Sequence, residues 1–300
     1  MLVAGASAAA AGAGVAPDEV APGVYVLHGD GGSITPANEG RVANLAFVIG
    51  PQGVVVVDSG ASMREGVRLI AAVQSVTRQP IRLLILTHAG QEVVFGAGAF
   101  QDRGIPVLMH RDAAALMASR CDGCLTRLRQ TLGEQTMAGS RVVTPDRLVT
   151  HGIALDLIGR RLALLAPGSP KGIGMLAVLD ERTQTLIAGG LVSIDHVPDM
   201  RDTGGQGWSD ALGALAQTKC STLVPAFGRV GDCSDIAAMS RYFAALDARV
   251  RDLLAHGVGL AELPSRCDLP AFARWDGYDD LHVQNANRAY LRLEHDLFLN

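Results

Sequence analysis

The chain has 300 residues, of which 48% are hydrophobic and 35 are glycine, and this composition is typical of a globular protein with a sizeable core. The formal net charge is −4, and the 26 basic residues are dispersed without a Lys/Arg cluster, so we expect no nucleic-acid partner. No apolar run reaches the roughly 18 to 20 residues that a membrane span needs, so we expect no membrane span.

The N-terminal stretch, residues 2–16, is apolar and rich in alanine and glycine. It resembles the end of a secretory signal peptide with a small-residue cleavage region, although no basic residue precedes it. We interpret residues 1–20 as a signal-peptide remnant or, alternatively, as a flexible tail, and residues 21–300 as a single domain with a C-terminal helical extension. The signal-peptide interpretation predicts a periplasmic or secreted protein.

The first half of the domain has the pattern of an α/β unit. The stretches 46–49 and 54–57 are rich in apolar and β-branched residues and flank Gly50-Pro51-Gln52-Gly53, which indicates a hairpin. Residues 54–57 are apolar on both faces, as in a central strand covered on both sides. The spacing of apolar residues predicts a helix, with Pro80 just beyond it. The expected elements are strands at 24–28, 46–49, 54–57 and 81–86 and a helix at 63–76.

The second half faintly repeats the first. A strand, a turn at 180–183 and a second strand match residues 46–60 in length. This repeat supports two related β-rich halves that face each other with helices outside, which is a four-layer αββα sandwich of the α/β class. We expect the last helix to pack across one sheet layer. The expected elements are strands at 161–165, 176–179 and 185–188 and helices at 112–132, 238–254 and 285–297.

Four stretches with turn residues at or just after apolar strands occur in an order that carries a family resemblance. They are Thr87-His88-Ala89-Gly90-Gln91-Glu92-Val93, Pro167-Gly168-Ser169-Pro170-Lys171-Gly172, Leu186-Ile187-Ala188-Gly189-Gly190-Leu191-Val192 and Val224-Pro225-Ala226-Phe227-Gly228-Arg229-Val230-Gly231. Together they resemble the metal-binding motifs of the metallo-β-lactamase superfamily, Thr-His-x-His-x-Asp-His, Gly-His-Thr-x-Gly, Gly-Asp and Pro-Gly-His-Gly. The resemblance runs from about residue 24 to the C-terminus, and it implies the same αββα sandwich.

Most ligand positions of those motifs carry other residues here. His88 keeps the first ligand position, and Glu92 replaces an aspartate. The remaining positions, with no comparable donor, are occupied by Gly90, Val93, Ser169, Gly190 and Phe227. A zinc site needs three or four ligands, so we expect no resident metal cofactor and at most weak zinc binding.

The finer resemblance is to exported metallohydrolases associated with quinoprotein-relay and sulfur-oxidation gene clusters. It rests on residues 36–40 and 43–45, on the helix that carries Cys121 and Cys124, and on the tail around Tyr278, His282, Asn285 and Glu294. It implies an exported protein whose pocket persists as a shape, with Phe227 and Val93 as apolar lining.

Three polar residues have structural interpretations beside functional ones. We expect His88 to be half-buried and hydrogen-bonded to a backbone carbonyl or to Asp58. Asp58 itself is expected to cap the helix that begins near Ser62 or to pair with the Thr87-His88 turn. The pair Asp195 and His196 is interpreted as a surface feature, and a rebuilt metal site is the alternative.

The cysteines suggest one disulfide. Cys121 and Cys124 lie a turn apart on one face of a predicted helix, so we interpret them as a disulfide, with a redox-active pair as the alternative. Cys220 and Cys233 flank the 224–231 turn, and Cys267 is the fifth cysteine.

The leading hypothesis is a non-catalytic binding or accessory protein that has lost its metals, with a small molecule or a protein as its partner. A zinc-dependent ester or thioester hydrolase using His88, Glu92 and a further residue such as Asp58 or His196 is the first alternative. A thiol-disulfide protein using Cys121 and Cys124 is the second. The sequence has no Gly-x-Ser-x-Gly elbow, P-loop or dinucleotide fingerprint, so serine-based and nucleotide chemistry have no support.

Overall fold

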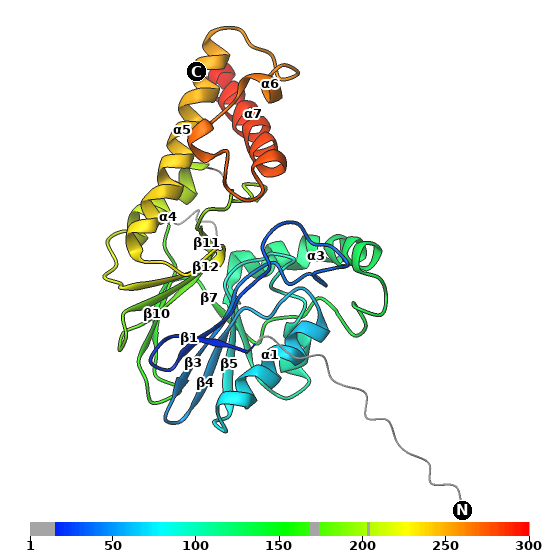
Figure 1. The fold of residues 1–300 in the computed structure, drawn as a ribbon, viewed down its shortest axis with the longest axis vertical. Helices are drawn as coiled ribbons and strands as arrows, with labels where there is room; N and C mark the ends of the chain where they lie inside the picture. Colours follow the sequence, from blue (N-terminus) through cyan, green and yellow to red (C-terminus); the bar gives the residue numbers. More distant parts are fainter. Residues whose placement is uncertain (1–15, 169–173, 203–204, 300) are drawn as a thin grey trace, which may run out of the picture.

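The computed structural model describes residues 16–168, 174–202 and 205–299, and these form two β-sheets packed face to face with helices outside (Figure 1). The predicted α/β fold, an αββα sandwich, is confirmed. Residues 1–15 and Ser169 lie outside the described residues, as do the interpretations that rest on them.

The first sheet has seven strands in chain order, from β1 at one edge to β7 at the other. Its centre is the apolar strand that sequence analysis predicted, with all five residues of β4 buried. The strand β1 forms from residues assigned to the tail, because it pairs with the next strand. The strands are β1 (Asp18–Ala21), β2 (Val24–Leu27), β3 (Leu45–Gly50), β4 (Gly53–Val57), β5 (Ile81–Leu86), β6 (Val107–His110) and β7 (Arg147–Val149).

The second sheet has five strands in the order β12-β11-β10-β9-β8. Its inner face meets the first sheet across an apolar core, which includes Val55, Val57 and Ile85 from one side and Val178 and Ile187 from the other. The strands are β8 (Ile153–Leu155), β9 (Leu162–Leu165), β10 (Ala177–Asp180), β11 (Thr185–Ser193) and β12 (Thr222–Phe227).

The two sheets share a topological unit, which confirms the predicted repeat. In the first sheet, β3 and β4 form an antiparallel hairpin, and α1 (Met63–Val76) then crosses to the parallel strand β5. In the second, β10 and β11 form the hairpin, and α4 (Gly205–Leu215) crosses to the parallel strand β12. Since such strands end at the same edge of their sheets, both units bring loop residues to one side of the sandwich.

The helices of the first half cover the outer face of the first sheet. The helix α1 begins at Met63 because the Ser62 side chain accepts a hydrogen bond from the backbone of Glu65, and it buries Leu69, Ile70 and Val73. The shorter α2 (Ala97–Gln101) and the long α3 (Arg111–Leu132) complete this layer. The bounds predicted from the sequence for α1, 63–76, and for β5, 81–86, match the structure.

The C-terminal helices stand away from the sandwich at one end of the molecule (Figure 1). Tyr242 and Leu246 of α5 (Ile236–Ala255) form a cluster with Tyr290 and Leu293 of α7 (Val283–Leu299). The expectation that the last helix packs across a sheet is therefore wrong: its apolar stripe is covered by α5 instead. The short elements between them are α6 (Leu263–Arg266), η2 (Pro270–Phe272) and η3 (Tyr278–His282).

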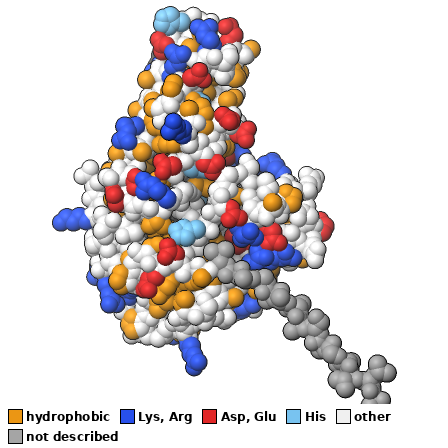
Figure 2. All heavy atoms as spheres, viewed as in Figure 1, with side chains coloured by type: hydrophobic (Ala, Val, Ile, Leu, Met, Phe, Trp, Pro, Cys, Tyr) orange, Lys and Arg blue, Asp and Glu red, His pale blue; other side chains and the backbone are white. Residues whose placement is uncertain are grey.

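Two observations bear on the expected absence of a membrane span and of a nucleic-acid partner. No helix in the described ranges is long and apolar enough to cross a membrane. On the face shown in Figure 2, acidic and basic side chains are interspersed, and no broad basic patch is present on that face. A basic stripe of the kind that binds nucleic acid is thus missing from the visible face.

Candidate functional site

A cavity of about 420 Å³ opens where the two repeated units meet the C-terminal segment. His88 enters it after β5, Gly190 and Ser193 from β11, and Phe227 from the end of β12. One face of α3 and the segment around Gly277 supply much of the remaining wall. Strand ends therefore position the polar groups, and helices enclose them.

A chain of hydrogen bonds runs along the first half of the site. Asp58 lies at the end of β4, buried, and accepts hydrogen bonds from the Thr87 backbone N–H and from Thr87 Oγ1, both at 2.8 Å. Thr87 Oγ1 lies 2.9 Å from His88 Nδ1. His88 Nε2 lies 2.8 Å from Glu92 Oε1, one helical turn further along the chain. Asp58 thus pairs with the Thr87-His88 turn, as predicted, whereas Ser62 caps α1 by itself.

Within this hydrogen-bond network, the pKa shifts favour a positive charge on His88 and a negative charge on Glu92. Burial alone would lower the pKa of His88, but the hydrogen bond and the negative charge of Glu92 outweigh it and raise that pKa. Burial would raise the pKa of Glu92, and the His88 interaction lowers it instead. Burial raises the pKa of Asp58 to about 6, against the opposing effect of His88 and the Thr87 hydrogen bonds. Both shifts favour the charged forms, and in that state His88 donates to Glu92 from Nε2 and to Thr87 from Nδ1.

This arrangement does not fit a zinc ion. Both imidazole nitrogens of His88 have partners inside the protein, so a metal ion would first have to displace Thr87 or Glu92 from the ring. A Cβ atom at Gly90 would collide with the Glu92 carboxylate and the His88 ring, and one at Gly190 would lie 2.7 Å from that ring. The space of two ligand side chains is thus taken by the pair. Across the residues that the structure describes, no three His, Cys, Asp or Glu side chains gather as a metal-binding group.

The second half of the site holds another histidine, His196. Its ring stacks on Phe227 with centroids 4.5 Å apart and planes at 9°. Its Nδ1 lies 3.0 Å from Asp276 Oδ2, and the same carboxylate oxygen accepts from the Gly32 backbone N–H. The neighbouring Asp195 instead pairs with Arg229. The interpretation of Asp195 and His196 as a surface pair is wrong, because His196 is buried and its partner lies 80 residues away.

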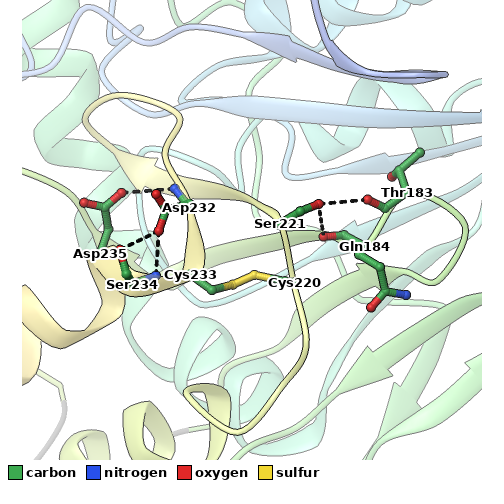
Figure 3. Close-up of a disulfide and its surroundings, with 8 residues drawn as sticks. All are labelled: Thr183, Gln184, Cys220, Ser221, Asp232, Cys233, Ser234 and Asp235. Carbon is green, nitrogen blue, oxygen red and sulfur yellow. Dashed lines mark hydrogen bonds between the residues drawn. A yellow bond between two sulfur atoms is a disulfide. The ribbon is translucent and has the colours of Figure 1, made fainter.

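The cysteine prediction requires correction. Cys121 and Cys124 lie on α3, as expected, but both are buried free thiols rather than a disulfide. Burial, and next the neighbouring Cys124, raise the pKa of the Cys121 thiol to about 12. The disulfide joins Cys220, before β12, to Cys233, in the 3-10 helix η1 (Cys233–Asp235) that leads into α5 (Figure 3). Hydrogen bonds of Ser221 and Asp232 fix the two ends of this loop.

Sequence reasoning placed the core of the site but missed part of its wall. Asp58, His88, Glu92, Gly190 and Phe227 lie close together. The expected hydrogen bond of His88 to a backbone carbonyl or to Asp58 is wrong, because its partners are Thr87 Oγ1 and Glu92. Val93 is fully buried in the first-half core and is absent from the cavity wall, so its predicted role as lining is wrong. Trp208, Met175 and Leu281 supply apolar lining instead.

Asp276 and Arg120 are the polar residues that the sequence did not reveal. Asp276 reaches the site only because an isolated β-bridge joins its backbone to His196. Arg120 lies one turn of α3 before Cys124, on the same helix face, and its guanidinium contacts Asp202 and the Ala89 carbonyl. A repeat of small and polar residues on that face, at helical spacing, was the available signal for Arg120.

Comparisons with known proteins agree with this architecture. The family model of the metallo-beta-lactamase superfamily matches residues 39–226. A metallo-beta-lactamase from Pontibacter korlensis is 20% identical, with a TM-score of 0.62, over 76% of this chain and 98% of that one.

Two further solved structures are similar at lower identity. A metallo-beta-lactamase from Hirschia baltica is 17% identical, with a TM-score of 0.58, over 76% of this chain and 96% of that one. The DIM-1 metallo-beta-lactamase, in a crystal exposed to ceftazidime, is 14% identical, with a TM-score of 0.59, over 76% and 95%. The search of curated proteins found no match. At these identities the solved structures show the fold alone.

Proposed function

The chain belongs to the metallo-β-lactamase superfamily, and from that premise we propose that it is a non-catalytic binding or accessory protein with a degenerate metal site. It binds its partner, a small molecule or a segment of a protein, in the cavity beside His88. Ester hydrolysis through a metal-bound hydroxide is not its function. The observation that carries this proposal is the closed His88–Glu92 pair.

The pair supports the proposal because it supplies internally what a metal would supply. A cation in this site would neutralise the negative charges of Glu92 and Asp58. The charged form of His88 does this instead, because it contacts Glu92 directly and reaches Asp58 through Thr87 Oγ1. Its position also fills the volume beside Gly90 and Gly190. Restoring a ligand at either position would first require His88 to move, so the site is organised around the pair.

The lining of the cavity supports ligand binding. Polar and charged side chains, among them Gln91 and Arg120, line it beside apolar ones. Apolar lining from Met175, Trp208 and Phe227 provides the contact area.

An exported location belongs to the same proposal, together with membership of the exported quinoprotein-relay and sulfur-oxidation subgroup. The disulfide Cys220–Cys233 supports it, because disulfides persist in oxidising compartments such as the periplasm. The subgroup resemblance of residues 36–40 and 43–45 also supports it: Asn38 and Asn44 there tie loops together, and Asn44 reaches the carbonyls of Pro225 and Gly228 beside Phe227.

The alternative functions have weaker support from the geometry. A thiol-disulfide function needs a thiolate, and burial raises the pKa of the Cys121 thiol far above neutral pH. A rebuilt zinc site needs a third donor beside two that are free, and His88 and Glu92 are bonded to each other.

Elemental analysis of protein purified without chelator tests the proposal. We expect much less than one equivalent of zinc per chain, and we expect chelator to leave the melting temperature unchanged, because the sheets are held by apolar packing. A Glu92→Ala variant serves as the matched control: it leaves His88 Nε2 without its partner, and it should gain little zinc because the one remaining ligand is too few. Roughly one or two tightly held metal ions per chain in the natural protein would contradict the proposal and favour a hydrolase.

A further inference from the structure

The geometry points to a hydroxyl-binding site at the second histidine: we propose that His196, oriented by Asp276, accepts a hydrogen bond from the hydroxyl group of an apolar alcohol or phenol bound in the cavity. This inference rests on the proposed function, since it names the chemical class of the ligand. Its two polar residues, His196 and Asp276, lie outside the four sequence motifs.

The carboxylate of Asp276 holds the imidazole in one orientation. Asp276 Oδ2 lies 3.0 Å from His196 Nδ1 and accepts from the Gly32 N–H at 2.6 Å. The backbone of Asp276 is also fixed, because it donates to the Asp195 carbonyl and accepts from the Val197 N–H, both at 2.9 Å. The Asp276 carboxylate, which accepts from His196 Nδ1, is thus held in position before any ligand binds.

The ring of His196 is held on its face as well as at its edge. Phe227 stacks on it nearly parallel, at 9° between planes. The Cε1 atom lies near Gly277, where even a Cβ would be 3.7 Å away, so that side of the ring is contacted but not crowded. With the face and one nitrogen fixed, the remaining polar atom of the ring, Nε2, has a defined direction.

The remaining nitrogen is an acceptor. A carboxylate on Nδ1 fixes the proton there, which leaves the lone pair of a neutral imidazole on Nε2. Burial lowers the pKa of His196, against the opposing effects of Asp276 and Glu92, so the ring is neutral at pH 7. Among the described residues, Nε2 has no hydrogen-bond partner, and it is not one of the fully buried partnerless atoms. Since His196 lines the cavity, Nε2 is reachable from it.

The rest of the wall is mixed. Met175, Trp208 and Leu281 offer apolar surface in the cavity, and charged side chains, including Arg120, Arg127 and Asp280, also line it. A neutral nitrogen acceptor selects a donor, and a hydroxyl on an apolar body matches both features. An ether or a hydrocarbon of the same shape would keep the apolar contacts and leave Nε2 unpaired.

Paired probes test this choice. We compare 2-naphthol with 2-methoxynaphthalene, which has a similar ring body and no donor, by titration against Trp fluorescence and by calorimetry at neutral pH. The natural protein should bind 2-naphthol about fivefold to tenfold more tightly, the value of one net hydrogen bond. In His196→Phe that ratio should fall to about one, with 2-methoxynaphthalene bound as before. Asp276→Asn should lower the ratio, and Asp195→Asn, which alters an acid bonded to Arg229, should not.

The outcomes separate the two proposals. If both probes bind with equal affinity, or if His196→Phe keeps the preference, the hydroxyl site is wrong and the binding function stands. If neither probe binds, the proposed binding function loses its support and the hydroxyl site falls with it. A nitrogen-15 spectrum of the natural protein gives an independent check. It should show neutral His196 with its proton on Nδ1, and a proton on Nε2 at neutral pH would overturn the inference whatever the probes do.

Discussion

Each of the two repeated units supplies a histidine that pairs with a carboxylate, His88 after β5 in the first and His196 after β11 in the second. In the first unit, His88 and Glu92 are four residues apart, and the imidazole is bonded at both nitrogens. In the second, His196 and Asp276 are 80 residues apart, and only Nδ1 is engaged among the described residues. The His88–Glu92 pair thus leaves no imidazole nitrogen without a protein partner, whereas the His196–Asp276 pair leaves Nε2 of His196 for a ligand in the cavity.

The source of the partner explains the difference. Glu92 lies on the loop after β5 and moves with His88, so the pair forms within one segment. Asp276 belongs to the C-terminal extension, which the matched family region, residues 39–226, does not include. The polar partner of His196 therefore comes from a segment outside the matched family region.

The disulfide belongs to the second unit alone, and its removal should have the largest effect on stability. Cys220 and Cys233 are 13 residues apart and join β12, which carries Phe227, to the start of α5. Replacing both by serine frees the unfolded chain from a loop of this length and should lower the free energy of unfolding by about 3 kcal/mol. Urea titrations with and without reductant measure this. The natural protein should lose the same amount in reductant and the double variant none; a natural protein indifferent to reductant would contradict the assignment.

Asp58 and Asp195 occupy corresponding positions in the two units, so the same substitution at each compares the units. Asp58 follows β4 with φ of 64° and is buried against Thr87, while Asp195 follows β11 with φ of 55° and pairs with Arg229 at the surface. Asparagine tolerates such a backbone, so only the side-chain bonds change. Asp58→Asn turns one acceptor into a donor facing Thr87 and should cost about 2 kcal/mol. Asp195→Asn should cost less than about 0.5 kcal/mol. Equal losses in urea titrations would show that the Asp58 network is not a stabilising feature.

Much of the fold followed from the sequence, since buried strands and amphipathic helices have local signatures. The apolar run of β4 and the helical spacing of α1 predicted these elements closely. The packing of α7 did not follow, because its apolar stripe does not say which surface covers it, and α5 rather than a sheet does so. Periodicity identifies a buried face and leaves its partner open.

The site shows the same limit. Motif order placed Asp58, His88 and Glu92 near one another, and the structure agrees. The closed state of His88 depended on which side chain reaches Nε2, and the pairing of His196 depended on a contact across 80 residues. Such bonds are set by tertiary packing and have no signal in local spacing. The predicted disulfide between Cys121 and Cys124 is wrong for a similar reason. Their spacing allows a disulfide, but both are buried on α3 as free thiols.

The last prediction concerns the pH dependence of stability and Glu65, a buried residue of α1 in the first unit. Burial raises its pKa from 4.5 to about 8, against the hydrogen bond from Ala61. The folded state therefore holds a proton that the unfolded state releases above pH 4.5, and stability falls as pH rises through this window, by about 1 kcal/mol per pH unit.

The second unit has the opposite sign. The pKa of His196 is lowered, so its contribution is present above 6.5 and is lost as pH falls. The raised pKa of His88 acts in the same direction as Glu65 above 6.5, so the natural protein alone cannot isolate one residue. Glu65→Gln keeps an acceptor for Ala61 and removes the titration, so the difference between variant and natural protein reports Glu65 only.

Urea titrations of both proteins between about pH 5 and pH 8 should give a variant whose advantage grows with pH. The acid-side loss from His196 should remain unchanged in the variant. A constant difference across this range would contradict the prediction. It would mean that Glu65 is ionised throughout, and that the first unit holds a buried negative charge on α1.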